Sequence, residues 1–531
     1  VFPVPRRFAL AAMTIALALP VAGTAQAALP APCSGGEAGF LCSQLTVPLD
    51  REGVRDGALR LKYAFDRPRS GRRGWLLALA GGPGQAAVSG ISGFKAVLEP
   101  LLDRRRLVVL DQRGTGSTAL ACPSLQELDA TDETPQAAVS ACANRLGDAR
   151  ADYTTADSVE DIEALRVRLG VERLAIAGIS YGTYVAVQYA RRYPDRVERL
   201  VLDSPVGPDG LDPFLLESYA PLRRIVAGWC RPIACPPAAG DPWRSLAMVV
   251  DAVRRSPLSA KVVAANGKRR TLKLSGESAI ARLVGSADLN PAIQALLPAA
   301  LADAANGRPK ALVRLLPAAQ GAAFRPREFS LALNLATECA ETRLPYELGD
   351  DAATRVARSA AAIDGVSPDL YAPFSREAVL EDSLASDCVP WPAAPGTAAP
   401  PAEPLPGVPA LILSGSLDQR TPTESARALA AKLPGASVVV LGGAGHDTLD
   451  SDTSGCIAKA LRRFSRGAAV GMPCSGKDIR WRTAMPLPAR LEAVRAQVDG
   501  GLSRTQEREV TAILLTLRDA ELQAYSLLYG G

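Results

Sequence analysis

The sequence has a single histidine among its 531 residues, at position 446. This scarcity argues against a zinc site at the closely spaced Cys230 and Cys235, because the further ligands that zinc needs are missing. It also leaves His446 as the only imidazole available to accept a proton. The glycine-rich stretch 81–84 is not followed by Gly-Lys-Ser/Thr, which excludes a phosphate-binding P-loop. These absences exclude two common kinds of site.

Neither sign of charge is in large excess. The formal net charge is +5, and it falls to +3 when residues 1–27, which carry only Arg6 and Arg7, are left out. This balance points to no particular partner, and we expect no binding of nucleic acid. With 48% hydrophobic residues, the chain can bury a large core.

The N-terminus lacks an apolar run long enough for a membrane span. Arg6 and Arg7 precede an apolar stretch, 8–21, which is shorter than the roughly 20 residues that a span needs and contains Pro20. Residues 25–27, Ala-Gln-Ala, form a small-residue cleavage site. We interpret 1–27 as a secretory signal peptide rather than a membrane anchor, and no cysteine follows it to take a lipid. The expected location is secreted or periplasmic, with no membrane contact after cleavage.

All ten cysteines lie beyond residue 27, an even number in a chain predicted to reach an oxidising compartment. They fall in close pairs along the sequence. From proximity alone we predict five disulfides: Cys33–Cys42, Cys122–Cys142, Cys230–Cys235, Cys339–Cys388 and Cys456–Cys474.

A Gly-x-Ser-x-Gly motif at 178–182 follows an apolar run, 173–177, and precedes a helical pattern, 184–190. Strand, motif and helix in this order are typical of a nucleophile elbow, in which a tight turn presents the serine above a sheet. The motif alone is weak, but its context makes Ser180 a candidate nucleophile.

The pattern around this motif predicts an α/β fold. Two alternating segments, 40–48 and 58–65, indicate antiparallel strands, and buried strands at 74–80, 107–110, 173–177, 199–203, 408–413 and 437–441 alternate with helices. A helix with Val159, Ile162, Leu165 and Leu169 on one face should be capped by Ser158 or Asp161 and end at Gly170. We therefore expect a mostly parallel sheet with helices on both faces.

The regular alternation stops at about residue 207. We divide the chain into a first core part (28–206), an inserted helical cap (207–405), a second core part (406–475) and a C-terminal helical extension (476–531). The cap ends in a Pro- and Ala-rich linker, 391–401. The extension contains helical patterns at 491–498 and 508–527, for which we expect packing on the surface.

Four features follow four predicted strands. Ser180 needs a base, an orienting acid and two backbone donors for the developing oxyanion. His446 is the base, and Asp418, in the loop after 410–413, is the acid in the chain order Ser, Asp, His. Asp418 could alternatively cap the following helix, and Asp447, Asp450 and Asp452 are rivals that we expect to be solvated. The backbone N–H groups of Gly82 and Tyr181 are the candidate oxyanion hole.

These motifs resemble those of the prolyl aminopeptidase family of α/β-hydrolases, and most of all its secreted tripeptidyl-aminopeptidase-like branch. The resemblance covers about residues 40–475 and rests on 81–84, 111–116, 178–183, 203–205, 415–422 and 445–447. It implies the α/β-hydrolase fold and the roles given above to Ser180, Asp418, His446, Gly82 and Tyr181. The family often has histidine where this chain has Ala80, and the tail beyond about Gly476 lies outside its pattern.

The resemblance also implies that Glu338 and Glu341, in Ala-Thr-Glu-Cys-Ala-Glu, bind the free N-terminus of a peptide. We therefore expect a monomeric serine aminopeptidase that releases short N-terminal peptides or proline-type residues through an acyl-enzyme. We expect it to need no cofactor and no metal. A carboxylesterase or lipase on the same fold is the alternative, and a non-catalytic binding protein is a third reading that the intact serine, acid and histidine argue against.

Overall fold

The computed structural model describes residues 30–33, 37, 39–68, 71, 74–127, 135–230, 235, 240–263, 268–320, 324–394, 404–479, 490–496 and 501–529. The signal peptide and most of the predicted linker lie outside these ranges. Within them, no helix combines the length and the apolar character that a membrane crossing requires.

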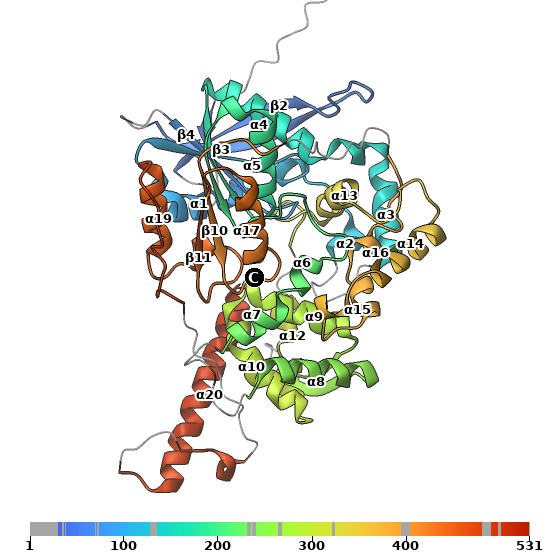
Figure 1. The fold of residues 1–531 in the computed structure, drawn as a ribbon, viewed down its shortest axis with the longest axis vertical. Coiled ribbons are helices and arrows are strands. Elements are labelled where there is room, and N and C mark those ends of the chain that lie inside the picture. Colours follow the sequence, from blue (N-terminus) through green and yellow to red (C-terminus); the bar gives the residue numbers. More distant parts are fainter. Residues whose placement is uncertain are drawn as a thin grey trace, which may run out of the picture.

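A nine-stranded sheet forms the centre of the described chain, with strand order β1-β2-β3-β5-β4-β6-β7-β10-β11. The first three strands pair antiparallel, and β3 pairs antiparallel with β5. The six strands β5, β4, β6, β7, β10 and β11 run parallel to one another. The prediction of a mostly parallel sheet is confirmed (Figure 1). The strands are β1 Ala31–Pro32, β2 Phe40–Pro48, β3 Ala58–Asp66, β4 Gly74–Leu79, β5 Arg105–Leu110, β6 Leu174–Ile179, β7 Val197–Asp203, β10 Ala410–Gly415 and β11 Ser437–Leu441.

Both faces of the sheet are buried, as continuous apolar strands require. In β4, Leu76 and Ala78 belong to one hydrophobic core, whereas Leu77 and Leu79 belong to the other. Successive side chains of a strand point to opposite faces, so β4 contributes to both cores. The first core lies under α1 (Ile91–Leu98) and α19 (Cys456–Ser465); the second lies under α4 (Thr155–Leu169), α5 (Tyr181–Arg192) and α17 (Thr423–Lys432).

Helix α4 begins earlier than the sequence pattern suggested. Thr154 is its N-cap and accepts from the N–H of Asp157, whose carboxylate accepts in turn from the N–H of Thr154. The predicted caps Ser158 and Asp161 are wrong, because both lie inside the helix and are buried. Asp161 instead forms a 2.8 Å ion pair with the fully buried Arg113. The predicted end is confirmed, since Gly170 adopts the left-handed conformation at the C-cap.

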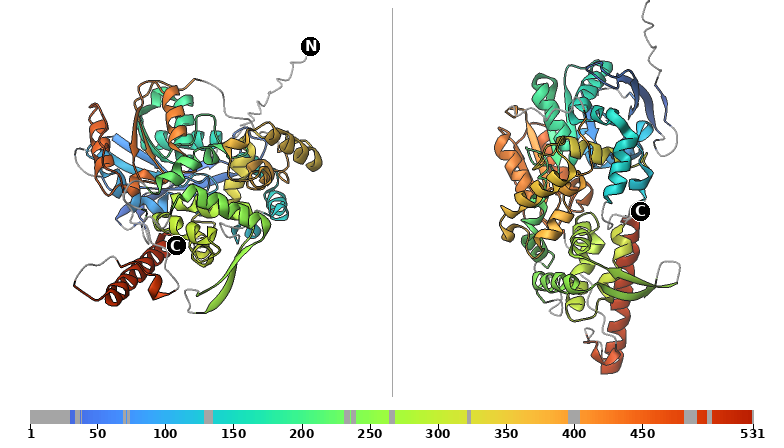
Figure 2. Two further views of the ribbon diagram at one scale, coloured as in Figure 1. Left: turned by 60° about the horizontal axis from the view of Figure 1, so that its bottom comes forward. Right: turned by 90° about the vertical axis from the view of Figure 1, so that its right-hand side faces the viewer.

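The segment between β7 and β10 is mainly helical and has a hydrophobic core of its own. It also contains a feature that the sequence reading missed, an antiparallel hairpin of β8 (Leu258–Val263) and β9 (Arg269–Leu274). The hairpin projects from the body in both views of Figure 2. That this segment forms a separate cap domain stays a prediction. Its helices are α6 Leu216–Tyr219, α7 Leu222–Gly228, α8 Pro242–Arg255, α9 Glu277–Gly285, α10 Pro291–Ala305, α11 Lys310–Val313, α12 Leu316–Gln320, α13 Leu331–Glu341, α14 Ala352–Asp364, α15 Arg376–Glu381 and α16 Leu384–Asp387.

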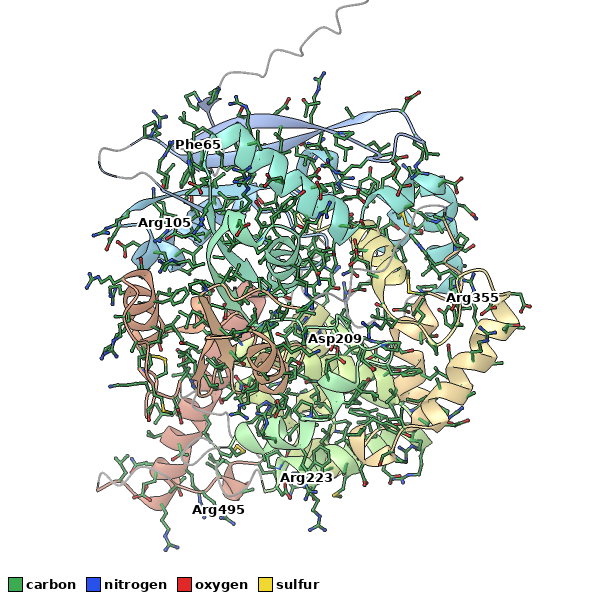
Figure 3. All side chains as sticks on the ribbon, turned by 45° about the horizontal axis from the view of Figure 1, so that its top comes forward. Phe65, Arg105, Asp209, Arg223, Arg355 and Arg495 are labelled. Atoms are coloured by element: carbon green, nitrogen blue, oxygen red, sulfur yellow. A yellow bond between two sulfur atoms is a disulfide. The ribbon has the colours of Figure 1, made fainter. Side chains whose placement is uncertain are left out.

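The C-terminal extension forms the long helix α20 (Arg504–Tyr529), which confirms the helix predicted at 508–527. It packs on α10 and α12 of the insertion, where Asp519 pairs with Arg314. The helix predicted at 491–498 is wrong where it is described, because only a 3₁₀ turn, Leu491–Ala493, forms there. Two exposed arginines, Arg223 of the insertion and Arg495 of the C-terminal extension, lie along the same edge of the molecule (Figure 3).

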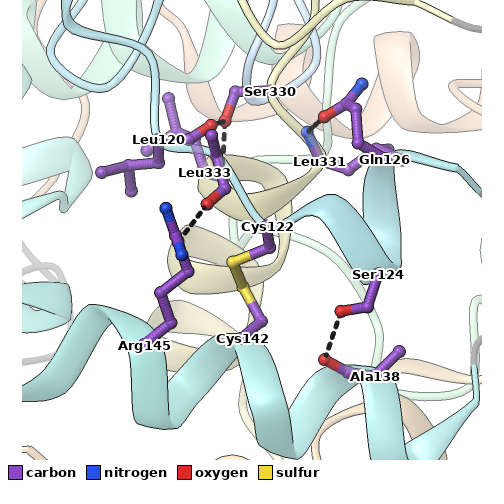
Figure 4. The surroundings of a disulfide bond; sticks show 11 residues. Leu120, Cys122, Ser124, Gln126, Ala138, Cys142, Arg145, Ser330, Leu331 and Leu333 are labelled. Carbon is purple, nitrogen blue, oxygen red and sulfur yellow. Dashed lines mark hydrogen bonds between the residues drawn. A yellow bond between two sulfur atoms is a disulfide. The ribbon is translucent and has the colours of Figure 1, made fainter.

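All ten cysteines are paired, in the five disulfides predicted from neighbouring positions. Cys122–Cys142 joins the start of α2 (Pro123–Gln126) to α3 (Gln136–Leu146), beside the N-terminus of α13. Figure 4 shows the contacts there: the Ser330 hydroxyl, which caps α13, donates to the carbonyl of Leu120. Cys339, within α13, is bonded to Cys388 after α16. Two disulfides therefore brace the surroundings of α13.

Candidate active site

Ser180 lies at a sharp turn between β6 and α5. Its φ of 55° and ψ of −124° are unusual for a residue with a side chain, and they mark local backbone strain. The flanking glycines are required by space: a Cβ on Gly178 would collide with the carbonyl of Gly182, and one on Gly182 would collide with the carbonyl of Leu79. The backbone N–H of Ser180 donates to the carbonyl of Asp203 at 2.9 Å, which fixes the turn on β7. The geometry is that of the predicted nucleophile elbow.

Asp418 and His446 meet at the ends of β10 and β11. The Nδ1 of His446 lies 3.0 Å from Oδ2 of Asp418, and both side chains are buried. Burial acts to raise the pKa of Asp418, but the charge and hydrogen bond of His446 and the hydrogen bonds from Thr421 outweigh it and hold the pKa below its ordinary value. Asp418 is thus an ionised partner for an imidazolium.

Thr421 is a neighbour of this pair that the sequence reading did not single out. Its hydroxyl lies 2.9 Å from Oδ2 of Asp418 and 3.1 Å from Nδ1 of His446, and its N–H donates to Oδ1 of Asp418 at 2.9 Å. The alternative role of Asp418 as a turn residue therefore coexists with its contact to His446. The only sequence signal for this contact is the spacing, because Thr421 lies three residues after Asp418 in the same loop.

The Asp-Ser dipeptide after β7 holds the loop that carries His446. The carboxylate of Asp203 accepts from the N–H groups of Thr448 and Leu449, at 3.2 and 2.9 Å. The hydroxyl of Ser204 accepts from the N–H of Asp447 at 3.0 Å. Burial, followed by the nearby charge of Asp447, raises the pKa of Asp203 well above its ordinary value. The hydrogen bonds to Asp203 and Ser204 tie β7 to the His446 loop.

The expectation that the rival acids are solvated holds for Asp450, which is exposed, but is wrong for Asp447. Asp447 is half-buried next to Asp203, and burial raises its pKa. It adopts a left-handed conformation, with φ of 63°, and lines the same cavity as Ser180. The carboxylate that accepts a hydrogen bond from Nδ1 of His446 is nevertheless that of Asp418.

Asp288, from the insertion, contacts both loops of the site. Its carboxylate accepts from the backbone N–H groups of Gln419 and Arg420, at 3.3 and 3.2 Å, and from the Arg420 guanidinium at 2.7 Å. Its backbone carbonyl accepts from the N–H of His446 at 2.8 Å. Nothing in the sequence patterns pointed to this residue. The insertion thereby fixes the loops that carry Asp418 and His446.

Among the residues that the structure describes, one group, Asp288, Asp418 and His446, brings ligand atoms within 4.8 Å of one another, close enough for a metal ion. The chemistry of the group fits a metal poorly. Asp288 already faces the positive charge of Arg420, and His446 and Asp418 are hydrogen-bonded to each other. The group is explained without a metal.

A cavity of about 470 Å³ opens above Ser180. His446 lines it, as do both candidate oxyanion donors, Gly82 and Tyr181. Tyr181 is the first residue of α5, where backbone N–H groups lack acceptors within the helix. The structure thus brings together, from the ends of four strands, the residues that the sequence reading assigned to one site.

The cavity is also lined by Glu338 and Glu341, on one side of α13. Glu341 accepts from the backbone N–H of Thr155 and from its hydroxyl, at 2.7 Å for the latter. Glu338 accepts from the side chain of Asn334 at 3.2 Å. Burial raises the pKa of Glu338 to about 8 and that of Glu341 to about 7. Two carboxyl groups therefore share the cavity with the candidate nucleophile and are poised to ionise near neutral pH.

Comparison with known proteins places this arrangement in a family. The family model described as the alpha/beta hydrolase fold matches residues 74–453, which include Ser180, Asp418 and His446. The chain belongs to the α/β-hydrolase family.

Curated relatives of this α/β hydrolase carry peptidase names. It is 30% identical over 200 residues to the serine protease Hip1 of Mycobacterium tuberculosis, a match covering 34% of this chain and 38% of the relative. It is 29% identical over 192 residues to a tripeptidyl aminopeptidase of Streptomyces lividans, covering 32% and 35%. A proline iminopeptidase of Neisseria meningitidis is 33% identical over 128 residues, covering 24% and 31%. The matches thus span about a third of each relative's length.

A solved α/β hydrolase from a deep-sea metagenome library aligns with 77% of this chain and 95% of its own, at 15% identity and a TM-score of 0.34. The family match identifies this chain as an α/β hydrolase.

Proposed function

We propose that this α/β hydrolase is a secreted serine aminopeptidase, which cleaves short peptides or proline-type residues from a free N-terminus. The observation that carries the proposal is the presence of Glu338 and Glu341 in the same cavity as Ser180. A free N-terminal ammonium needs a negative partner when it leaves water. The peptidase names of the relatives support the same substrate class.

In this mechanism Ser180 attacks the scissile carbonyl. A bond forms between Oγ and the carbonyl carbon while the Oγ proton passes to Nε2 of His446. The N–H groups of Gly82 and Tyr181 stabilise the oxyanion, and Asp418 stabilises the imidazolium. The C–N bond then breaks, and His446 returns the proton to the leaving amine.

The resulting acyl-enzyme is hydrolysed by the reverse use of the same groups. His446 takes a proton from water, the hydroxide adds to the ester carbon, and the Ser180 oxygen leaves with the proton from His446. The net reaction adds one water across the peptide bond and regenerates the enzyme.

In this proposal, the carboxyl groups of α13 make the enzyme selective for substrates with a free N-terminus. Their raised pKa values mean that Glu338 is largely neutral at pH 7 before substrate arrives. A bound ammonium favours the ionised carboxylates, so binding shifts both groups towards the charged form. A substrate whose N-terminus is acetylated cannot supply this interaction and leaves the cavity carboxyls unpaired.

The decisive experiment compares peptidyl-arylamides that have free or acetylated N-termini. We expect the free form to be cleaved with a kcat/KM at least about 100-fold higher, because loss of a charged hydrogen-bonded contact is costly. Equal rates on both forms would contradict the aminopeptidase proposal.

The nucleophile is tested with Ser180→Ala, which should lower kcat by at least about 1,000-fold. The matched control is Ser256→Ala, at an exposed position after α8, which should behave as wild type. Near wild-type activity in Ser180→Ala would exclude the proposed mechanism.

One observation favours a second candidate, a carboxylesterase. The cavity has apolar walls, including Val206, Leu211 and Phe329, which suit an apolar acyl group. An aryl ester of a fatty acid with no amino group separates the two. A higher kcat/KM on that ester than on every free-N-terminal arylamide would favour the esterase.

The proposed location outside the cytoplasm is supported by the disulfides. Five of them join all ten cysteines, which is compatible with an oxidising, extracellular environment.

A further inference from the structure

A second cavity of about 400 Å³ adjoins the cavity above Ser180. Four residues line both: Leu215, Ser218, Leu289 and Arg420. The Arg420 side chain, 42% exposed, stands at this junction, next to Thr421 and the Asp418–His446 pair. The two spaces therefore meet beside the candidate base.

The lining residues give the two cavities an order along the site. Helix α13, with Glu338 and Glu341, lines only the first cavity. Helices α9 and α12 contribute to the second cavity and not to the first. Ser180 and His446 line the first cavity, and Arg420 connects it to the second. A substrate crossing the whole site would run from α13, past Ser180 and His446, towards α9 and α12.

The chemistry of acyl transfer orients the substrate along this line. His446 has to deliver a proton to the leaving nitrogen, so the chain after the scissile bond must pass the histidine. The free N-terminus, at the opposite end of the substrate, is held at α13 under the function proposed above. We propose that the second cavity is the leaving-group subsite, which binds apolar side chains of the one or two residues that follow the scissile bond.

The residues that line the second cavity are the reason for proposing that it binds apolar side chains. Leu289 and Phe324 are 50% and 52% exposed, which is high for large apolar residues that line a cavity. Three small apolar residues, Ala281, Ala318 and Ala319, line the same cavity.

The charged groups that line the second cavity are paired. Arg420 binds Asp288 at 2.7 Å, and Arg282 binds Asp382 at 2.8 Å; Asp382 also accepts from the Tyr219 hydroxyl. A charged leaving peptide would have to compete with these pairs, whereas an apolar one would cover open apolar surface.

This inference rests on the proposed aminopeptidase function, and the substrates are chosen so that the two can fail separately. Three substrates share the acyl part that the arylamide assay finds best: one ends in 4-nitroaniline, one continues with Gly-Gly and one with Phe-Phe. We expect wild type to cleave the Phe-Phe substrate with a kcat/KM at least about ten-fold above that of Gly-Gly. A ratio near one would overturn the subsite while leaving arylamide cleavage, and the proposed function, intact.

Two variants change the subsite in opposite directions. Ala318→Phe fills the cavity, and Phe324→Ala removes an apolar wall. Both should bring the Phe-Phe to Gly-Gly ratio to within about three-fold of one. Ala353→Phe, at an exposed position of α14, is the matched control and should keep the wild-type ratio.

The buried Ala318 site carries a risk of overpacking, which Phe324→Ala avoids because Phe324 is half exposed. If Ala318→Phe fails to fold, the ratio in Phe324→Ala decides. A wild-type ratio in every folded variant would overturn the inference. Loss of 4-nitroanilide cleavage in wild type itself would contradict the proposed function instead.

Discussion

Glu338 and Glu341 line the cavity above Ser180, and under the proposed function their burial lowers stability in return for substrate binding. Burial raises the pKa of Glu338 to about 8, from an ordinary value of about 4.5. The unfolded chain therefore loses this proton near pH 4.5, while the folded chain keeps it until about pH 8. Since the folded state binds more protons across that interval, its stability falls as the pH rises through it. We expect this loss of stability from a buried carboxyl group whose proposed role is to bind the substrate ammonium.

The Glu338→Gln variant tests both sides of this trade. It cannot ionise, so its melting temperature should fall less than that of wild type between pH 5 and pH 8, measured by thermal denaturation. The same variant should lose at least about ten-fold in kcat/KM on free-N-terminal arylamides. Glu172→Gln, at an exposed position, is the control. Parallel melting curves for wild type and Glu338→Gln would show that Glu338 ionises normally.

Asp418 has the opposite pH behaviour. Its pKa is held below the ordinary value, so it stays ionised to lower pH than a free aspartate and contributes stability that is lost only as the pH falls through the lowered pKa. Asp418→Asn should lower kcat near neutral pH by roughly 10,000-fold, because the imidazolium loses its carboxylate and its tautomer is no longer fixed.

The matched control for Asp418→Asn is Asp450→Asn, an exposed acid in the loop of His446 itself. Steady-state kinetics on a free-N-terminal arylamide should leave this control close to wild type. A large loss in Asp450→Asn with a small one in Asp418→Asn would reverse the assignment of the acid.

Two disulfides lie in or beside helix α13. It begins at Ser330, whose hydroxyl bonds Leu120 beside Cys122–Cys142, and it contains Cys339, bonded to Cys388. These cysteines share one small hydrophobic cluster with the apolar face of α13. The helix that carries Glu338 and Glu341 thus has its position fixed from both ends.

A Cys339→Ala/Cys388→Ala double variant should loosen α13. The bond closes a separation of 49 residues, for which the chain-entropy model gives roughly 4 kcal/mol. We expect KM for free-N-terminal arylamides to rise several-fold, while kcat/KM for an acetylated arylamide or an aryl ester changes little. Removing Cys33–Cys42, at the far edge of the sheet, is the control. Equal losses on all substrates would mean that the bond serves folding alone.

The sequence was most informative about site residues that directly follow a predicted strand. Ser180 and His446 could be predicted as site residues because each follows a strand and lies in a glycine-containing turn, a pattern that is local in the sequence. Thr421, Asp203 and Asp288 were not, because their contacts join loops that are distant in the chain. Asp288 lies in the insertion, where no periodic pattern fixed the position of any element against the sheet.

The same limit explains the errors in the fold. The hairpin β8–β9 is short and lies among helices, so its alternation at 269–274 was overlooked. Helix α4 starts earlier than predicted because Thr154 and Asp157 cap its N-terminus reciprocally. Ser158 and Asp161 have residue types typical of caps, but both are buried inside the helix. Arg113 shows why: a fully buried guanidinium needs a carboxylate partner, and Asp161 supplies it.

At the scale of the whole molecule, α20 connects the C-terminal extension to the insertion rather than to the sheet. Leu522 is 2% exposed and belongs to the core of the insertion, whereas Leu517 on the same helix is 62% exposed. Leu522→Ala should lower the free energy of unfolding by about 2–5 kcal/mol, measured by denaturant titration.

The control for this contact is Leu517→Ala, which should change stability by less than about 0.5 kcal/mol. If both variants unfold at the same denaturant concentration as wild type, α20 does not pack on the insertion in solution.

The order of the strands along the chain means that Ser180 is synthesised well before Asp418 and His446. The strand and helix that present Ser180 emerge early during synthesis, but β10 and β11, which carry Asp418 and His446, follow only after the long insertion. A nascent chain therefore holds a serine without a proton acceptor, and β7 remains an unpaired sheet edge until β10 arrives. Pairing of β10 with β7 and of β11 with β10 is also what places Asp418 and His446 at the same edge of the sheet as Ser180. The nucleophile proposed at Ser180 therefore gains its proposed base and acid only after the residues of β10 and β11 have been made.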